Sequence, residues 1–245
     1  MMMSPFPVAS VIAVAFLCSS ANAFVTMNKP AHAVHLLAEV SDSNDLFASD
    51  GWGPIEKDLD RVPIFCCANG QGKPLAYTVE IKDATYTVPF FYCDIEDAKE
   101  ELEKAKEGTG LGDDVGIIPF PLGKAFQMWA QDKAVIVPNK EAILQAGAPP
   151  GSNPIGQQVP LFACMDIMQA NEDGGGVLPL FMVLEEANDA LASALKMDGG
   201  DIDEFEIISL SLQKAVQLLA TVPETPAFQF MAPEKSLKYI NEYLS

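Results

Sequence analysis

Residues 88–102 read "VPFFYCDIEDAKEEL", and residues 178–191 read "LPLFMVLEEANDAL". Each stretch has an aliphatic residue, a proline, a large apolar residue and a phenylalanine, and each leads into an acidic, alanine-containing segment typical of a helix start. Other pairs follow in the same order: "VPIF" and "VPLF", then "LGKAFQMWA" and "LQKAVQLLA". Several matches in one order, at spacings of about ninety residues, indicate an internal duplication.

The hydrophobic pattern of the first copy predicts its elements. Asp94 is a candidate N-cap for a helix in which Ala98, Leu102 and Ala105 share one face. Two strands precede that helix in a hairpin, and a third leads into it. These strands correspond to short apolar runs at 62–68, 75–81 and 86–93. A strand, a helix, another strand and a third helix complete the copy.

The predicted fold class is therefore α+β, with two tandem copies of a β-β-α-β-α-β-α unit related by a pseudo-twofold axis. The first copy covers residues 61–146 and the second covers 159–245. Residues 147–158, which are rich in glycine and proline, form the predicted linker. In the last helix, we expect Leu237, Ile240 and Leu244 to form the apolar stripe.

The first 23 residues are predicted to be a signal peptide, because an uncharged segment with an apolar core ends in an A-x-A cleavage site at Ala23. That apolar core is shorter than the roughly 20 residues that cross a bilayer. Phe24 follows the site and resembles the phenylalanine that begins transit segments in the bipartite plastid leaders of algae with secondary, red-derived plastids. We therefore interpret residues 24–60 as a transit-like segment and a mobile acidic linker. Plain secretion is the alternative.

Composition excludes several classes of function. The formal net charge of −19 argues against electrostatic binding of nucleic acid or anionic lipid. Both histidines, His32 and His35, lie in the leader, so a processed chain has no histidine for a triad or a metal site. The five cysteines form no C-x-x-C pair. We predict no catalytic residue, metal or cofactor, and no enzymatic activity.

A thiol-redox protein that uses Cys66 and Cys67 is one alternative to a protein without chemistry of its own. Neighbouring residues of a strand point to opposite faces, and free cysteine is a common core residue. Packing in the core is therefore the favoured interpretation of this pair.

Large apolar side chains beside the prolines are the candidate binding residues. Consecutive aromatic residues of a strand cannot all face one core. Either both faces of the sheet are covered, or some of these side chains line an exposed apolar groove for peptides, whose acidic rim would attract basic segments. The groove hypothesis takes in Phe65, Phe90, Phe91, Phe162, Phe181 and Met182.

The duplicated motifs resemble those of the 22-kDa subunit family of the translocon at the inner envelope of chloroplasts (the Tic complex). The resemblance rests on "VPIF", "VPFF" with "EDA", and "PLGKAFQ" in the first copy, and on "VPLF", "LPLF" with "EEA", and "LSLQKAVQ" in the second, and it covers residues 61–245. It implies a soluble, non-enzymatic protein-import factor of the envelope intermembrane space with chaperone-like binding. Its expected partners are preproteins, their transit peptides and translocon subunits, with membrane association only through protein partners. A secreted or lumenal structural module with all aromatic residues in its core is the alternative.

Overall fold

The computed structural model describes residues 43–81, 84–109, 114–170, 176–198, 201, 205–221 and 227–243. The predicted signal peptide and most of the predicted transit segment lie outside these residues. Two helices precede the first half, α2 (Ser43–Ala48) and α3 (Trp52–Leu59). The first half then contains β1 (Pro63–Asn69), β2 (Ala76–Ile81), β3 (Ala84–Tyr92), α4 (Ile95–Thr109), β4 (Val115–Pro121), α5 (Leu122–Ala130), β5 (Val135–Val137) and α6 (Lys140–Gln145).

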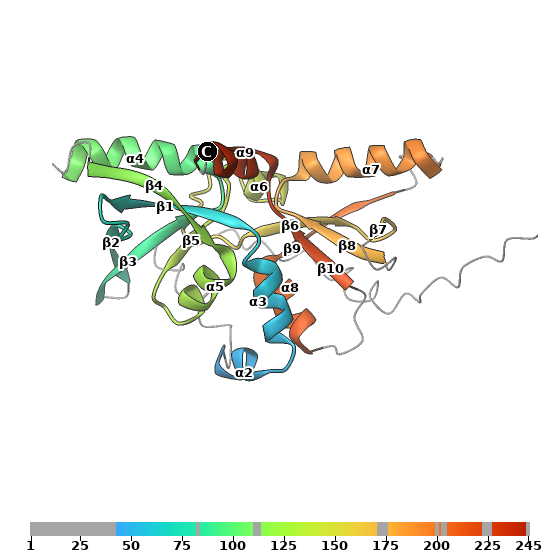
Figure 1. The fold of residues 1–245 in the computed structure, drawn as a ribbon, viewed down its shortest axis with the longest axis horizontal. Helices are drawn as coiled ribbons and strands as arrows, with labels where there is room; N and C mark the ends of the chain where they lie inside the picture. The colour runs from blue at the N-terminus through green and yellow to red at the C-terminus, as the bar shows by residue number, and fades with distance from the viewer. Residues whose placement is uncertain are drawn as a thin grey trace, which may run out of the picture.

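The second half repeats this order of elements, so each half is a β-β-β-α-β-α-β-α unit and the predicted β-β-α-β-α-β-α unit is one strand short. The second half contains β6 (Pro160–Cys164), β7 (Gln169–Ala170), β8 (Gly176–Phe181), α7 (Leu184–Asp198), β9 (Ile207–Ser211), α8 (Leu212–Thr221), β10 (Ala227–Met231) and α9 (Glu234–Tyr243). The predicted α+β class is confirmed, with one sheet in each half (Figure 1). Among the described residues, no helix is long and apolar enough to cross a membrane.

The two sheets have the same pairing pattern. In the first sheet, Tyr92 of β3 pairs with Phe65 of β1 and, on its other side, with Val137 of β5. In the second, Phe181 of β8 likewise lies between Phe162 of β6 and Met231 of β10. The β5 and β10 strands run parallel to their neighbours, and all the other pairs are antiparallel.

This register corrects the alignment of the two copies. Matching Pro89 with Pro179 makes Phe91 the counterpart of Phe181, whereas the strand pairs make Tyr92 that counterpart. A shift of one residue moves a side chain to the other face of a sheet. Phe91 accordingly lies in the central core, as Leu180 does, while Phe181 lies under an outer helix.

The central core lies between the halves. It combines one face of each sheet with the inner sides of α3, α5 and α8, which occupy the lower part of Figure 1. The four helices α4, α9, α6 and α7 form a row along the opposite side of the sheets (Figure 1). Helices therefore cover both faces of each sheet, except at the edge strand β2, where Ala76 and Thr78 are exposed.

The outer helices exchange between the halves. Tyr239 of α9 packs in the outer cluster of the first sheet, beside Phe65. Ala142 of α6 packs in the outer cluster of the second sheet, with Phe162. The last helix of each half therefore covers the sheet of the other half, and the two halves interlock.

The predicted mobile linker before residue 61 is corrected by α3. Its side chains Trp52, Ile55 and Leu59 are at most 4% exposed and belong to the central core. Their spacing of i, i+3 and i+7 places them on one helical face, which is an apolar stripe that the acidic composition of the segment obscures. The ordered domain therefore begins before the first copy.

Candidate functional site: an open depression on the last helix

The six predicted groove residues are all buried. Their exposed fractions run from 0% for Phe65 and Phe91 to 7% for Phe181, with Phe90, Phe162 and Met182 between these values. Phe91 and Met182 lie in the central core, and the other four lie in the outer clusters. The predicted exposed groove is thus wrong for these residues, because helices cover both faces of each sheet and consecutive side chains fill both cores.

The neighbouring thiols lie in separate environments. Cys66 faces the central core, whereas the Sγ of Cys67 lies 3.8 Å from the backbone oxygen of Ala98 in α4. Burial, followed by the influence of Cys67, raises the pKa of Cys66 to about 12, and burial raises the pKa of Cys67 to about 11. Because the thiolate is the reactive form, these environments disfavour the redox alternative.

Exposed apolar side chains lie elsewhere. The large apolar residues that stand out on the described surface are Leu144, Ile155, Met168, Leu237 and Tyr243. Two of these, Leu237 and Tyr243, lie on α9. This helix therefore carries two of the five exposed large apolar side chains.

The inner face of α9 explains why Leu237 is exposed. Ser236 is 1% exposed, and the ring of Tyr239 meets that of Phe65 edge-on at 5.4 Å between centroids. The Lys99 ammonium of α4 lies 5.8 Å above the Tyr239 ring. The helix thus buries Ser236 and partly buries Tyr239 and Ile240, and Leu237 points away with 45% of its surface exposed. The predicted stripe is corrected at Leu237, because the small Ser236 faces the core in its place, while Ile240 does pack inward. Leu244, the third predicted member, lies outside the described residues.

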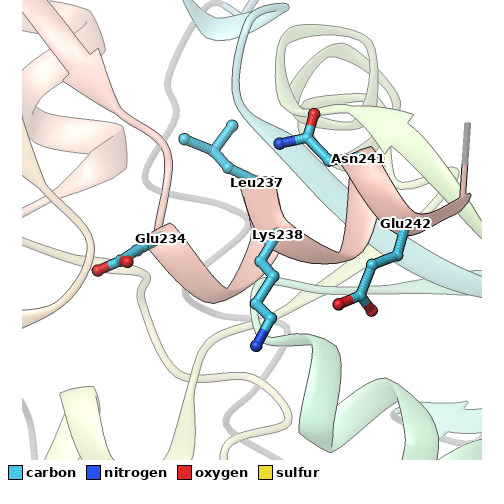
Figure 2. Close-up of a pocket in the computed structure, with 5 residues that line it drawn as sticks. All are labelled: Glu234, Leu237, Lys238, Asn241 and Glu242. Atoms are coloured by element: carbon cyan, nitrogen blue, oxygen red, sulfur yellow. The ribbon is translucent and has the colours of Figure 1, made fainter. Parts of the chain in front are cut away.

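An open depression of about 410 Å³ lies along the exposed side of α9. Glu234, Leu237, Lys238, Asn241 and Glu242 line it. In Figure 2, Leu237 and Asn241 project to one side of the helix, and Lys238 and Glu242 project to the other. The lining therefore combines one leucine with two carboxylates and one ammonium group. The depression was not predicted, because the exposed side of an amphipathic helix depends on how the helix docks.

The start of α9 is held by α7. The Oε1 of Glu186 accepts the backbone N–H of Glu234 at 2.8 Å. Burial raises the pKa of Glu186, and the N–H of Glu234 opposes that rise. The first residue of the depression is thus positioned by a half-buried carboxylate from a neighbouring helix.

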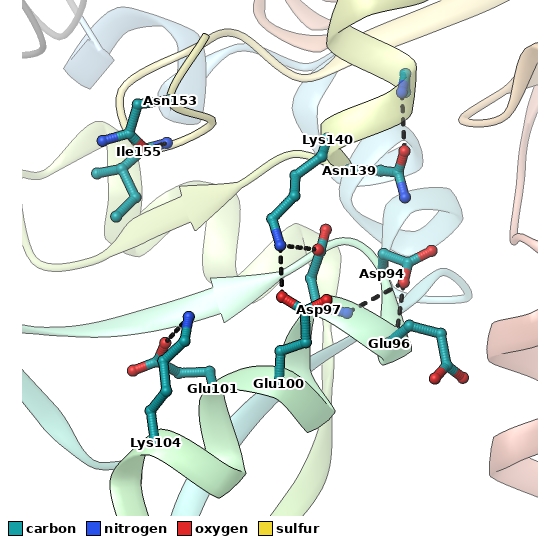
Figure 3. A network of polar contacts seen from close by, with 11 residues as sticks. Asp94, Glu96, Asp97, Glu100, Glu101, Lys104, Asn139, Lys140, Asn153 and Ile155 are labelled. Carbon is teal, nitrogen blue, oxygen red and sulfur yellow. Dashed lines mark hydrogen bonds and ion pairs between the residues drawn. The ribbon is translucent and has the colours of Figure 1, made fainter. Parts of the chain in front are cut away.

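The start of α6 is held by α4 in a different way. The Nζ of Lys140 lies 3.0 Å from Asp97 and 2.7 Å from Glu100 (Figure 3). Burial raises the pKa of Asp97, and the contacts with Lys140 oppose that rise. Lys140 and Glu234 are each the first residue of their helix. The backbone N–H of each bonds a carboxylate of the neighbouring helix, and the first half adds the ammonium group of Lys140.

A second, much smaller cavity of about 10 Å³ lies at the seam between the halves, which is room for about one water molecule. Cys93, Asn139, Met182 and Pro233 are among its lining residues. In the described part of the chain, no group of three or more His, Cys, Asp and Glu residues is placed to hold a metal ion. The arrangement on α9 offers apolar contact and negative charge, which suits binding of apolar or basic segments.

Comparison with known proteins places the fold. No protein-family model matches the chain, and no curated protein matches its sequence. Among solved structures, "Tic22 from Plasmodium falciparum" matches with a TM-score of 0.63 and 19% identity, over 78% of this chain and 97% of that one. "Anabaena Tic22 (protein transport)" matches with a TM-score of 0.62 and 18% identity, over 78% of this chain and 96% of that one. The chain therefore has a Tic22-like fold.

Proposed function

We propose that this protein is a protein-import factor of the plastid envelope intermembrane space, which binds incoming preproteins in a chaperone-like way. It acts without catalysis or a cofactor, and translocon subunits recruit it to the membrane. The observation that carries this proposal is the Tic22-like fold over 78% of the chain, since one of the matched structures is described by the words "protein transport". The open depression on α9 supplies a candidate binding surface.

Binding at the depression needs only weak contacts. Burying about 100 Å² of apolar ligand surface against Leu237 contributes roughly 2.5 kcal/mol, part of which is offset by the entropy of association. The carboxylates of Glu234 and Glu242 and the net charge of −19 favour basic segments. Transit peptides are basic and amphipathic, so they match both features.

We also infer that the two halves arose by duplication and are related by a pseudo-twofold axis. Leu122 donates its backbone N–H to the oxygen of Val62 at 3.0 Å, and Leu212 donates to Val159 at 2.8 Å. The matching strand pairs and the exchanged helices α6 and α9 support the same relation. An equivalent binding surface on α6 does not follow, because Leu144 and Leu237 occupy different positions in their helices.

The test is substitution of Leu237 with Glu in the full chain, with Leu144→Glu as the matched control. Both leucines are exposed on a helix, at 45% and 43%, but only Leu237 lines the depression. We expect Leu237→Glu to reduce site-specific photocrosslinking of a plastid preprotein at least fivefold, while Leu144→Glu leaves it unchanged. Equal crosslinking in both variants would remove the depression from the proposal.

A second candidate is a secreted or lumenal structural module, and the burial of all six predicted groove residues favours it. Localisation separates the two candidates. A fluorescent fusion of the full chain should lie at the plastid periphery, and Phe24→Lys should reroute it. Fluorescence of the unchanged chain in the medium or in secretory compartments would support the structural module and contradict the import factor.

A further inference from the structure

Helix α3 bridges the two halves of the molecule. It packs on α5 of the first half and on α8 and β10 of the second, and it lies between them in Figure 1. Trp52, Ile55 and Leu59 point from one face of the helix into the central core. This is the arrangement by which an amphipathic helix is recognised in an apolar groove, with anchors at i, i+3 and i+7.

The groove fits the helix closely at both ends. At the start, a Cβ on Gly51 would lie 2.6 Å from the backbone oxygen of Ala220 in α8. Near the end, a Cβ on Gly123 of α5 would lie 2.9 Å from the backbone oxygen of Glu56. The α8 helix has Gln213 where α5 has Gly123. Gly123 thus stands at the start of α5, the helix start that lies against α3.

Polar contacts set the orientation of α3. The backbone N–H of Phe230 in β10 donates to Asp58 at 2.9 Å, and that of Lys124 donates to Asp60 at 3.2 Å. The Lys124 ammonium also pairs with Glu56. These three carboxylates thus contact β10 of the second half and α5 of the first half. The groove therefore makes both apolar and polar contacts with the helix that occupies it.

The sheets do not depend on α3 for their pairing. Within the described residues, the strand pairs of both sheets involve no residue of α3. Residues 60–62 connect the helix to β1. Its N-cap, Gly51, provides no side-chain hydrogen bond, and within the described residues the buried Nε1 of Trp52 has no hydrogen-bond partner. Release of the helix would regain chain entropy and would break no strand pair, but it would expose the apolar side chains that contact Trp52, Ile55 and Leu59, so an occupant with the same anchors is needed to cover them.

We propose that the groove formed by α5, α8 and β10 is a second binding site, for short amphipathic helices, and that α3 occupies it as an intramolecular ligand. An external helix that binds there carries large apolar residues at i, i+3 and i+7, a small residue facing Ala220 and a carboxylate facing Phe230. Its access is controlled by release of α3. This inference goes beyond the proposed function, because the site lies on the side of the sheets opposite α9 (Figure 1).

The experiment uses the full chain and a fluorescein-labelled synthetic peptide with the sequence of residues 43–62. Gly51→Ala creates the clash with Ala220 without backbone strain, since the φ of −73° at Gly51 suits alanine. Gly53→Ala is the matched control, because a Cβ there meets no atom within 4 Å. We expect Gly51→Ala to bind the peptide at least tenfold more tightly than either the unchanged chain or Gly53→Ala. Equal binding by all three chains would overturn the proposal.

Hydrogen exchange of the unchanged chain provides the decisive result if Gly51→Ala does not fold. The α3 amides should exchange at least tenfold faster than the paired amides of β1 and β4. Exchange of α3 together with those strands would show that the helix is a fixed part of the core and would overturn the proposal. Neither measurement uses a preprotein, so its outcome is distinct from that of the import test.

Discussion

The two halves of the molecule build the same framework and connect it differently. Their sheets share one pairing pattern, and α4 and α7 each have 15 residues. At the junction of these helices with the exchanged ones, a backbone N–H bonds a carboxylate in both halves, from Lys140 to Asp97 and from Glu234 to Glu186. The first half adds the ion pair of the Lys140 ammonium group with Asp97. The two halves therefore have the same backbone pairing but different side-chain contacts at the junctions. Substitutions at the junctions can test each half separately.

The largest expected effect comes from the register of the two sheets. Phe91 is fully buried in the central core with both described tryptophans, whereas Phe181 lies in a smaller outer cluster. We expect Phe91→Ala to lower the free energy of unfolding by about 4 kcal/mol and Phe181→Ala by about 3 kcal/mol. Urea denaturation measures both values.

Tryptophan fluorescence under native conditions sharpens this comparison. Trp52 and Trp129 both belong to the central core, so Phe91→Ala should shift their emission and Phe181→Ala should not. Ile155→Ala, at a position with 39% exposure, is the control and should change stability by less than about 0.5 kcal/mol. An equal emission shift for both phenylalanine variants would contradict the placement of Phe91 in the central core and of Phe181 in a separate outer cluster.

The framework could be predicted from local patterns. Apolar runs and caps depend on neighbouring residues only, so the strands and helices fall close to their predicted positions. Asp94 is confirmed as the N-cap of α4, since its Oδ1 accepts the N–H groups of Glu96 and Asp97 at 2.7 and 3.3 Å.

Relations between elements could not be predicted in this way. The repeated proline suggested a register that is wrong by one residue, because strand pairing depends on both neighbours of β3 and β8 and not on a motif. The sequence also does not indicate which sheet α6 or α9 covers, so the exposure of Leu237 could not be inferred. The burial of α3 had a local signal in its Trp52, Ile55 and Leu59 stripe, but acidic neighbours masked it.

An intermediate effect is expected at the charged junction. Lys140→Ala leaves the Asp97 carboxylate, whose side chain is 12% exposed, without its cation, and should lower the free energy of unfolding by about 1–2 kcal/mol near neutral pH. Loss of the cation raises the pKa of Asp97 further, so the destabilisation should shrink as the pH falls and the carboxyl becomes protonated.

Two control variants separate the junction from ordinary surface charge. Lys106→Ala removes only an exposed pair with Glu103 and should cost less than about 0.5 kcal/mol. Glu234→Ala retains the backbone N–H that Glu186 accepts, so it should also have little effect. A loss at Glu234 as large as that at Lys140 would show that the two junctions depend equally on side-chain charge.

The smallest effect is expected at Glu186, whose pKa is raised mainly by burial. Because the folded state retains this proton at pH values where the unfolded chain has lost it, its contribution to stability falls as the pH rises from about 4.5 through the raised folded pKa. Glu186→Gln keeps an oxygen for the Glu234 N–H and removes the charge. It should therefore raise the free energy of unfolding by less than about 1 kcal/mol at about pH 7 and leave it nearly unchanged at about pH 4.

Urea titrations of the Glu186→Gln variant at the two pH values test this, with Glu185→Gln as a control for the loss of one exposed negative charge. A difference that is equal at both pH values would assign the effect to packing and not to proton binding. A loss of stability at about pH 7 would mean that the Glu234 N–H requires a full negative charge, as Lys140 does in the first half. The two junctions would then be electrostatically alike in spite of their different partners, and the second half would hold α9 by charge as firmly as the first half holds α6.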